Sequence, residues 1–226
     1  MMLLRQGWHI FQKDLLLEWH SKQVISSMLT FSVLVVVVFA FAFPPSRGIT
    51  EAVFPGMIWV AFTFAGVLGL NRAFVSEKHQ DCLMGLMLAP CDPVSIYTGK
   101  TLGTFFLMAA MEIISLPLFL VFFDYKIGGS IGLLVLVIFL GTLGFATVGT
   151  LLGALAANTR TSEILLPLIL FPIIVPILIA SVKATGLILT GSSQVEQLAT
   201  WIRLLVVYDL IFLIAPLLLF EYVLEV

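Results

Sequence analysis

Six long apolar runs constrain this chain more than any other feature of its sequence. They lie at approximately 24–43, 53–74, 101–123, 131–156, 163–189 and 202–224. A helix needs about 20 predominantly apolar residues to cross a lipid bilayer. Charged residues make up only 11% of the chain, against about 25% in an ordinary soluble domain. We therefore predict an all-α, polytopic membrane protein with six transmembrane helices in a single domain, residues 1–226.

The composition also argues against several classes of function. The formal net charge is −2 and no basic stripe is present, which argues against nucleic acid as a partner. Two cysteines, Cys82 and Cys91, and three histidines, His9, His20 and His79, follow no ligand spacing, so we expect no metal site and no cofactor bound by this chain. A membrane enzyme is disfavoured because no paired nucleophile and base is recognisable.

Residues 92–101, DPVSIYTGKT, end like a phosphate-binding loop. The full motif, G-x-x-x-x-G-K-[ST], requires its first glycine at position 94, where this chain has Val94. A branched side chain blocks the close approach of backbone amides to phosphate. We therefore interpret Lys100 as a basic anchor at the membrane surface, where the third span begins.

The first apolar run has an alternative interpretation as a cleaved signal peptide, because Ala40-Phe41-Ala42 resembles a cleavage site. The run is longer than the usual apolar segment of about 7–15 residues, which favours a spanning helix.

Six spans place both termini on one side of the membrane. With the termini in the cytosol, basic residues divide seven to four, with Arg5, Lys13, Lys22, Arg72, Lys78, Lys100 and Arg160 inside and Arg47, Lys126, Lys183 and Arg203 outside. Basic residues concentrate on the cytosolic side of membrane proteins. This predicts a multi-pass protein of the cytoplasmic (inner) membrane with cytosolic termini.

Residues 1–23 predict a cytosolic, interfacial amphipathic helix before the first span. At 100° per residue, one narrow face carries five apolar side chains, Leu4, Trp8, Phe11, Leu15 and Trp19. The opposite face carries Arg5, His9, Lys13 and His20. Tryptophan at the edge of an apolar face is typical of a helix lying in the headgroup layer, so membrane lipid is an expected partner.

Residues 75–98 predict a cytosolic loop between the second and third spans. Its middle, residues 82–88, is apolar but too short to cross the membrane. Ser76 or Glu77 could start a helix there, and Pro90 would end it. An apolar helix in the cytosol favours docking to a partner protein, and the alternative is a segment resting on the membrane.

Two acidic residues fall inside predicted spans. Glu112 lies twelve residues after Lys100, near the middle of the bilayer, and Asp209 lies six residues after Arg203. An acidic side chain at such depth is costly and usually functional. The alternatives are a role in a transport pathway and a structural hydrogen bond between helices.

Prolines and small residues predict how the spans bend and pack. Pro117 should kink the third span, and Pro167, Pro172 and Pro176 should kink or break the fifth. In the fourth span, Gly149 and Gly153, with Ala157 four residues on, form a stripe suited to close helix contact.

The loop and its flanks resemble the type-2 ABC transporter permeases, and more closely the heme exporter protein B (CcmB) family of cytochrome c maturation permeases. Six stretches carry the resemblance: RAFVSEK at 72–78, LMLAP at 86–90, IYTGK at 96–100, GTLGFATVGT at 141–150, AANTR at 156–160 and FEYVLE at 220–225. The loop pattern is shared by many ABC permeases, and the later stretches favour the CcmB family.

The resemblance implies a permease subunit without enzymatic activity of its own. It implies that ATP binds a separate CcmA-like ATPase subunit, and that ATP hydrolysis there is coupled either to heme transport, with heme as the substrate, or to release of the heme-loaded chaperone. Further partners would be a CcmC-like heme-handling protein, a CcmE-like heme chaperone and a second copy of the permease. The ATPase-coupling residues would be Phe74, Glu77, Lys78, Leu83, Leu86, Leu88 and Pro90.

The chain departs from the family pattern at two points of this loop. Asp81-Cys82 stands where a glycine is usual, and Cys91-Asp92-Pro93 replaces a valine-rich turn. Two alternative functions remain: the permease of another ABC-2 exporter, for a drug, lipid or polysaccharide, and an ion-gradient-driven secondary transporter using Glu112 or Asp209.

Overall fold

The computed structural model describes residues 2–43, 47–79, 92–157 and 162–224. Within these residues the chain is helical and contains no strand. Its seven helices are α1 (Met2–Ser21), α2 (Gln23–Ala42), α3 (Arg47–His79), α5 (Pro93–Phe122), α6 (Ile131–Ala157), α7 (Ser162–Leu189) and α8 (Val195–Leu224). Six of them are long and apolar enough to cross a membrane, by length and composition, which confirms the predicted fold class.

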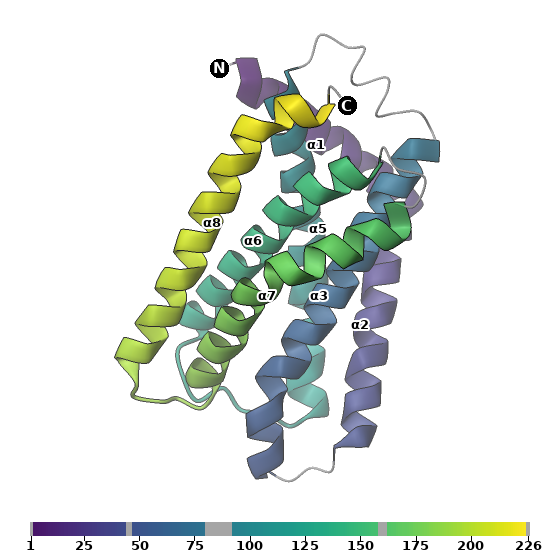
Figure 1. Ribbon diagram of the computed structural model, residues 1–226. Coiled ribbons are helices and arrows are strands. Elements are labelled where there is room, and N and C mark those ends of the chain that lie inside the picture. Colours follow the sequence, from purple (N-terminus) through teal and green to yellow (C-terminus); the bar gives the residue numbers. More distant parts are fainter. Residues whose placement is uncertain (1, 44–46, 80–91, 158–161, 225–226) are drawn as a thin grey trace.

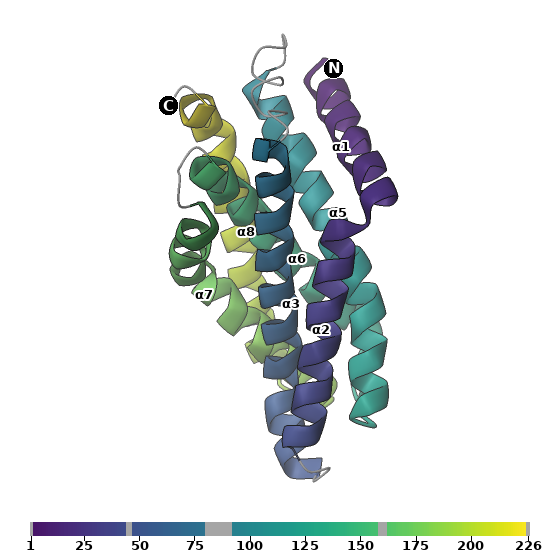
Figure 2. The same cartoon turned by 90° about the vertical axis from the view of Figure 1, so that its right-hand side faces the viewer.

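The six long helices form one bundle, and α1 lies beside the end of it that carries both termini (Figures 1 and 2). We call this the terminal end, and the end with the α5–α6 and α7–α8 connections the far end. Within the bundle, α6 packs against α3, α5, α7 and α8.

The helix bounds differ from the predicted runs at both ends of the bundle. At the far end, α3 begins at Arg47 and α8 at Val195, six and seven residues before the predicted spans. α3 continues to His79, so Ser76 and Glu77 lie in its last turns and do not start a separate helix. α5 begins at Pro93, eight residues before the predicted span. Hydropathy locates the membrane-crossing part of a helix, whereas these ends are polar continuations that hydropathy does not detect.

The surface and the interior of the bundle are arranged as a lipid solvent requires. Large apolar side chains such as Phe41, Ile113 and Val121 are exposed on the outside. Glu112 and Asp209 are instead each only 3% exposed. Polar groups in a bilayer cost least when they face other helices, so this distribution supports a membrane-embedded bundle.

The prolines lie within helices that continue past them. Pro117 is inside α5, and Pro167, Pro172 and Pro176 are inside α7, which changes direction along its length (Figure 1). Proline removes a backbone donor and crowds the preceding turn, which bends a helix. Close packing occurs at Gly149, where an added Cβ would collide with the side chain of Leu70 on α3.

The connections at the far end are bonded to each other. The Gly128 N–H donates to the carbonyl oxygen of Leu189 at 2.9 Å. Gly191 has φ 63°, a conformation that favours glycine, and it lies against the backbone of Gly128. Tyr125 stacks on Phe54 of α3, with ring centroids 4.3 Å apart. Burial raises the pKa of the Tyr125 phenol, and the nearby charge of Glu51 raises that pKa further.

Candidate functional site

The base of α5 is the first part of the candidate site. The Asp92 side chain accepts a hydrogen bond from the Val94 N–H at 2.9 Å, and Pro93 is the first helical residue. An acceptor before the helix and a proline in its first turn are strong start signals. Lys100 therefore lies about two turns inside a helix, where the wrapped backbone of a phosphate loop cannot form.

An ion pair joins α5 to α1. The Lys100 ammonium lies 2.9 Å from the Asp14 carboxylate, and the two side chains are only 11% and 20% exposed. Lys13 also contacts Asp14, at 3.1 Å. The sequence-based interpretation of Lys100 as a surface anchor gave it no partner. The sequence does contain a signal for such a pair. Asp14 and Glu18 are acidic residues one turn apart on an otherwise basic helix, which indicates a basic partner elsewhere.

The backbones of α1 and α5 also approach closely. A Cβ on Gly99 would lie 2.7 Å from the Gly7 carbonyl oxygen and 2.8 Å from the Cβ of Ile10. The Ser95 hydroxyl donates to the side-chain oxygen of Gln6 at 3.3 Å. This close contact depends on glycine in both helices. α1 is therefore packed against α5 as well as joined to it by the ion pair.

The face that α1 buries only partly matches the predicted apolar face. Ile10 and Phe11 are buried, whereas Trp8 and Trp19 are 52% and 75% exposed. α1 buries the side that meets α5, and its tryptophans remain on the outer surface. At the C-terminal end of α1, Glu18 accepts a hydrogen bond from the Ile25 N–H at 2.8 Å and so caps α2.

Further polar contacts join α5 to α6. The Tyr97 hydroxyl donates to the backbone oxygen of Thr147 at 3.1 Å in a buried position. Deeper in the bundle, the Thr142 hydroxyl lies 2.8 Å from each carboxylate oxygen of Glu112. This hydrogen bond joins α5 to α6 inside the bundle.

Asp209 on α8 is in a different situation. Both of its carboxylate oxygens are buried, and neither has a hydrogen-bond partner among the described residues. The side chain lies against Gly144 of α6. The hydroxyl of its neighbour Tyr208 donates to the Ile173 oxygen at 3.0 Å. A buried polar group without a partner calls for a functional or structural explanation.

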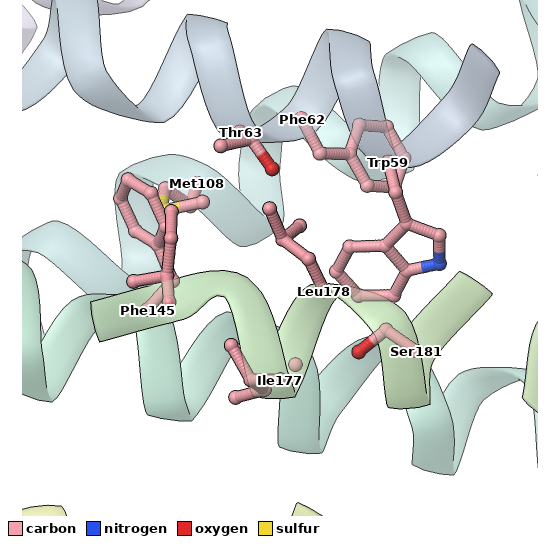
Figure 3. Close-up of a pocket in the computed structure, with 10 residues that line it drawn as sticks. Trp59, Phe62, Thr63, Met108, Phe145, Ile177, Leu178 and Ser181 are labelled. Carbon is pink, nitrogen blue, oxygen red and sulfur yellow. The ribbon is translucent and has the colours of Figure 1, made fainter. Parts of the chain in front are cut away.

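A narrow pocket lies between α3, α5, α6 and α7 (Figure 3). Thr63 and Ser181 contribute hydroxyls, and Trp59, Phe145 and Ile177 form part of its apolar wall. Its volume of about 10 Å³ has room for about one water molecule. Beside it, the Trp59 indole N–H donates to the Thr185 hydroxyl at 3.0 Å, joining α3 to α7.

The residues assigned to ATPase coupling divide into two groups. Phe74, Glu77 and Lys78 lie in the last turns of α3. Leu83, Leu86, Leu88 and Pro90, and the helix predicted at 82–88, lie outside the described residues. Within the described parts of the chain, no three side chains of His, Cys, Asp or Glu come together as metal ligands would.

The comparisons with known proteins agree with the resemblance in the sequence. Residues 5–221 match the family described as CcmB protein. A heme exporter protein B of Pseudomonas aeruginosa is 25% identical over 167 residues, covering 74% of each chain. The Rhodobacter capsulatus protein of that name is 28% identical over 151 residues, covering 67% of this chain and 69% of its own length. The Haemophilus influenzae one is 25% identical over 182 residues, covering 79% of this chain and 81% of its own. With a match that runs over nearly its whole length, this chain belongs to the CcmB protein family.

Proposed function

We propose that this chain is the membrane permease subunit of an ABC-type heme exporter that serves c-type cytochrome biogenesis. The observation that carries the proposal is the family match over residues 5–221, with relatives named heme exporter protein B. ATP hydrolysis would take place in a separate CcmA-like ATPase subunit. CcmC-like and CcmE-like proteins would hand over and receive heme.

The arrangement of α3 and α5 supports the coupling part of this proposal. Both helices border the segment 80–91, and both continue without interruption into the bundle. In the proposal this segment, with Phe74, Glu77 and Lys78, docks on the ATPase from the cytosol. A displacement there would reach α1 through the Asp14–Lys100 ion pair and α6 through the hydrogen bond from Tyr97.

The size of the inner pocket bears on the route of the cargo. A pocket for a drug-sized ligand has a volume of about 300–1,000 Å³, whereas the pocket of Figure 3 has about 10 Å³. The proposal therefore places any passage of heme at a surface that this chain shares with a second copy or with a partner subunit. It does not route heme through the interior of one bundle.

The test is a paired substitution at the end of α3. Phe74→Ala with Glu77→Lys should reduce co-purification of the ATPase subunit and the level of heme-stained c-type cytochromes, while the permease stays in the membrane. The matched control is Phe122→Ala with Glu196→Lys, which makes the same changes at the far end, where both residues are exposed. Unchanged ATPase binding and unchanged cytochrome levels in the first variant would contradict the proposal.

A further inference from the structure

A groove of about 620 Å³ lies between the first half of α2 and the last part of α3, at the terminal end of the bundle. Figure 2 shows these two helices side by side, with the α1–α2 connection at the upper end of α2. The groove is open to the outside and is lined by Ser21, Lys22, Gln23, Ser26, Ser27, Thr30, Phe31, Leu34, Leu68 and Arg72.

The lining is cationic at its outer end. Lys22 and Arg72 are both exposed, and neither forms an ion pair with a described residue. Glu18 lies close by, where its carboxylate accepts hydrogen bonds from the Ile25 N–H and the Ser21 hydroxyl, but it is not among the residues that line the groove. Among the described side chains that line the groove, none is acidic. Its charge therefore suits an anion.

The groove changes from polar to apolar along its length. Ser26, Ser27 and Thr30 follow Lys22 along α2 and supply hydroxyl groups, and Leu34 is three turns deeper. At about 1.5 Å per residue, Leu34 lies about 18 Å from Lys22 along the helix. Phe31 and Leu68 line this deeper part as well. A polar outer end and an apolar inner part match the two parts of an amphiphile held upright in a membrane leaflet.

Two kinds of acidic amphiphile could satisfy this charge pattern, and the side chains favour one. An iron porphyrin is normally held by His, Cys, Met or Tyr on the metal. None of these residue types occurs among the described side chains that line the groove. A phosphodiester needs only cations and hydroxyl donors around its oxygens, which Lys22, Arg72 and Ser26 can supply.

We propose that the groove binds one anionic phospholipid, with its phosphate between Lys22 and Arg72 and an acyl chain along Phe31, Leu34 and Leu68. The bound lipid would hold α2 against α3 two turns before α3 ends at His79. This inference does not depend on heme as the cargo, because it rests on the groove alone.

The test compares lipid binding in the full chain and in variants, reconstituted in mixed vesicles of phosphatidylcholine and phosphatidylglycerol. Native mass spectrometry then counts the phosphatidylglycerol molecules retained. Each basic residue near an anionic membrane surface contributes about a factor of five in affinity. Lys22→Gln with Arg72→Gln should therefore lower retention of one lipid by about 25-fold, since two basic residues are removed.

Two further variants keep the test decisive. Lys126→Gln with Arg203→Gln removes two exposed cations elsewhere and should leave retention unchanged. Ser26→Trp fills the groove, keeps both cations and should also lose the lipid, so charge and shape are tested separately.

Three outcomes would overturn the proposal. The first is equal retention in the Lys22/Arg72 variant and the unmodified chain. The second is an equal loss in the Lys126/Arg203 control, which would show nonspecific attraction. The third is a Soret band on adding ferric heme that disappears in the Lys22/Arg72 variant, which would assign the groove to heme.

Discussion

The Lys100 ammonium lies 2.9 Å from the Asp14 carboxylate, and this pair fixes α1 to the base of α5. Asp92, which caps α5, is two turns before Lys100 and directly follows the segment 80–91. Three contacts therefore hold α1 against the first turns of α5. They are this ion pair, the close approach of Gly7 and Gly99, and the hydrogen bond from Ser95 to Gln6.

Removing one member of this ion pair should destabilise the protein. Lys100→Met leaves Asp14 half-buried with only Lys13 as a neighbour, and we expect a loss of about 1–3 kcal/mol, between the values for exposed and fully buried pairs. Asp14→Asn should cost a similar amount, and the double variant should cost less than the sum. Lys13→Gln is the control, since Lys13 is 38% exposed. Thermal unfolding in detergent measures all four, and strictly additive losses would contradict a direct interaction.

The close approach of α1 and α5 gives a second prediction. Gly99→Ala places a methyl group against the Gly7 backbone and Ile10, and should cost about 1–3 kcal/mol. Gly103→Ala is the matched control one turn further along α5, because the nearest atom there is 3.9 Å away. Alanine should be neutral or stabilising at that position. Faster trypsin cleavage at Lys13 and Lys22 in Gly99→Ala alone would show that α1 is less tightly packed against α5. Equal cleavage rates in the two variants would contradict the contact.

The hydrogen bond from Thr142 to Glu112 should stabilise the folded protein. Thr142→Val removes the hydroxyl and leaves the buried carboxylate without it, whereas Thr142→Ser retains it. Hydrogen bonds between membrane helices contribute about 0.6 kcal/mol on average and up to about 1.7 kcal/mol. We expect a coupling energy of that size in a double-mutant cycle with Glu112→Leu, which removes the acceptor, measured by thermal unfolding. A coupling energy of zero would show that the contact is not energetically significant.

Replacing Asp209 should not destabilise the protein, in contrast to removing the Thr142 hydroxyl. Because neither carboxylate oxygen has a described partner, Asp209→Asn removes a buried acidic group and breaks no hydrogen bond. We expect an unfolding midpoint equal to or above that of the unmodified chain, together with a fall in c-type cytochrome yield if the acid serves transport. A lower midpoint would indicate that Asp209 has a structural partner in the assembled protein.

The orientation of the bundle can be tested by cysteine labelling. In a background with Cys82→Ser and Cys91→Ser, Ser130→Cys and Ser192→Cys place exposed thiols at the far end, and Gln23→Cys places one at the terminal end. With cytosolic termini, a membrane-impermeant maleimide added to intact cells should label positions 130 and 192 and leave position 23 unlabelled. The reverse pattern would invert the topology.

The sequence predicts the membrane-crossing helices well, because a lipid solvent imposes a long apolar run on each of them. It predicts the ends of α3 and α5 less well, since polar helix beyond the membrane has no hydropathy signal. Ser76 and Glu77 illustrate this, because both are plausible helix starts and both lie within α3.

The buried polar contacts were harder to predict than the helices. Glu112 stands out in an apolar run, so its importance was recognisable, but its partner Thr142 comes from another helix. Nothing local to Lys100 identifies Asp14, 86 positions earlier in the chain. Such pairs depend on how helices are arranged in space, which hydropathy and spacing do not specify.

The bonded connections at the far end constrain how the bundle can move. Gly128 joined to Leu189, and Tyr125 stacked on Phe54, hold the ends of α3, α5, α6 and α7 together there. At the terminal end, the outer edge between α2 and α3 is instead an open groove. If the bundle opens along this groove, the contacts at the far end would be the fixed point. The displacement would then be largest at the terminal end, where α3 borders the segment 80–91.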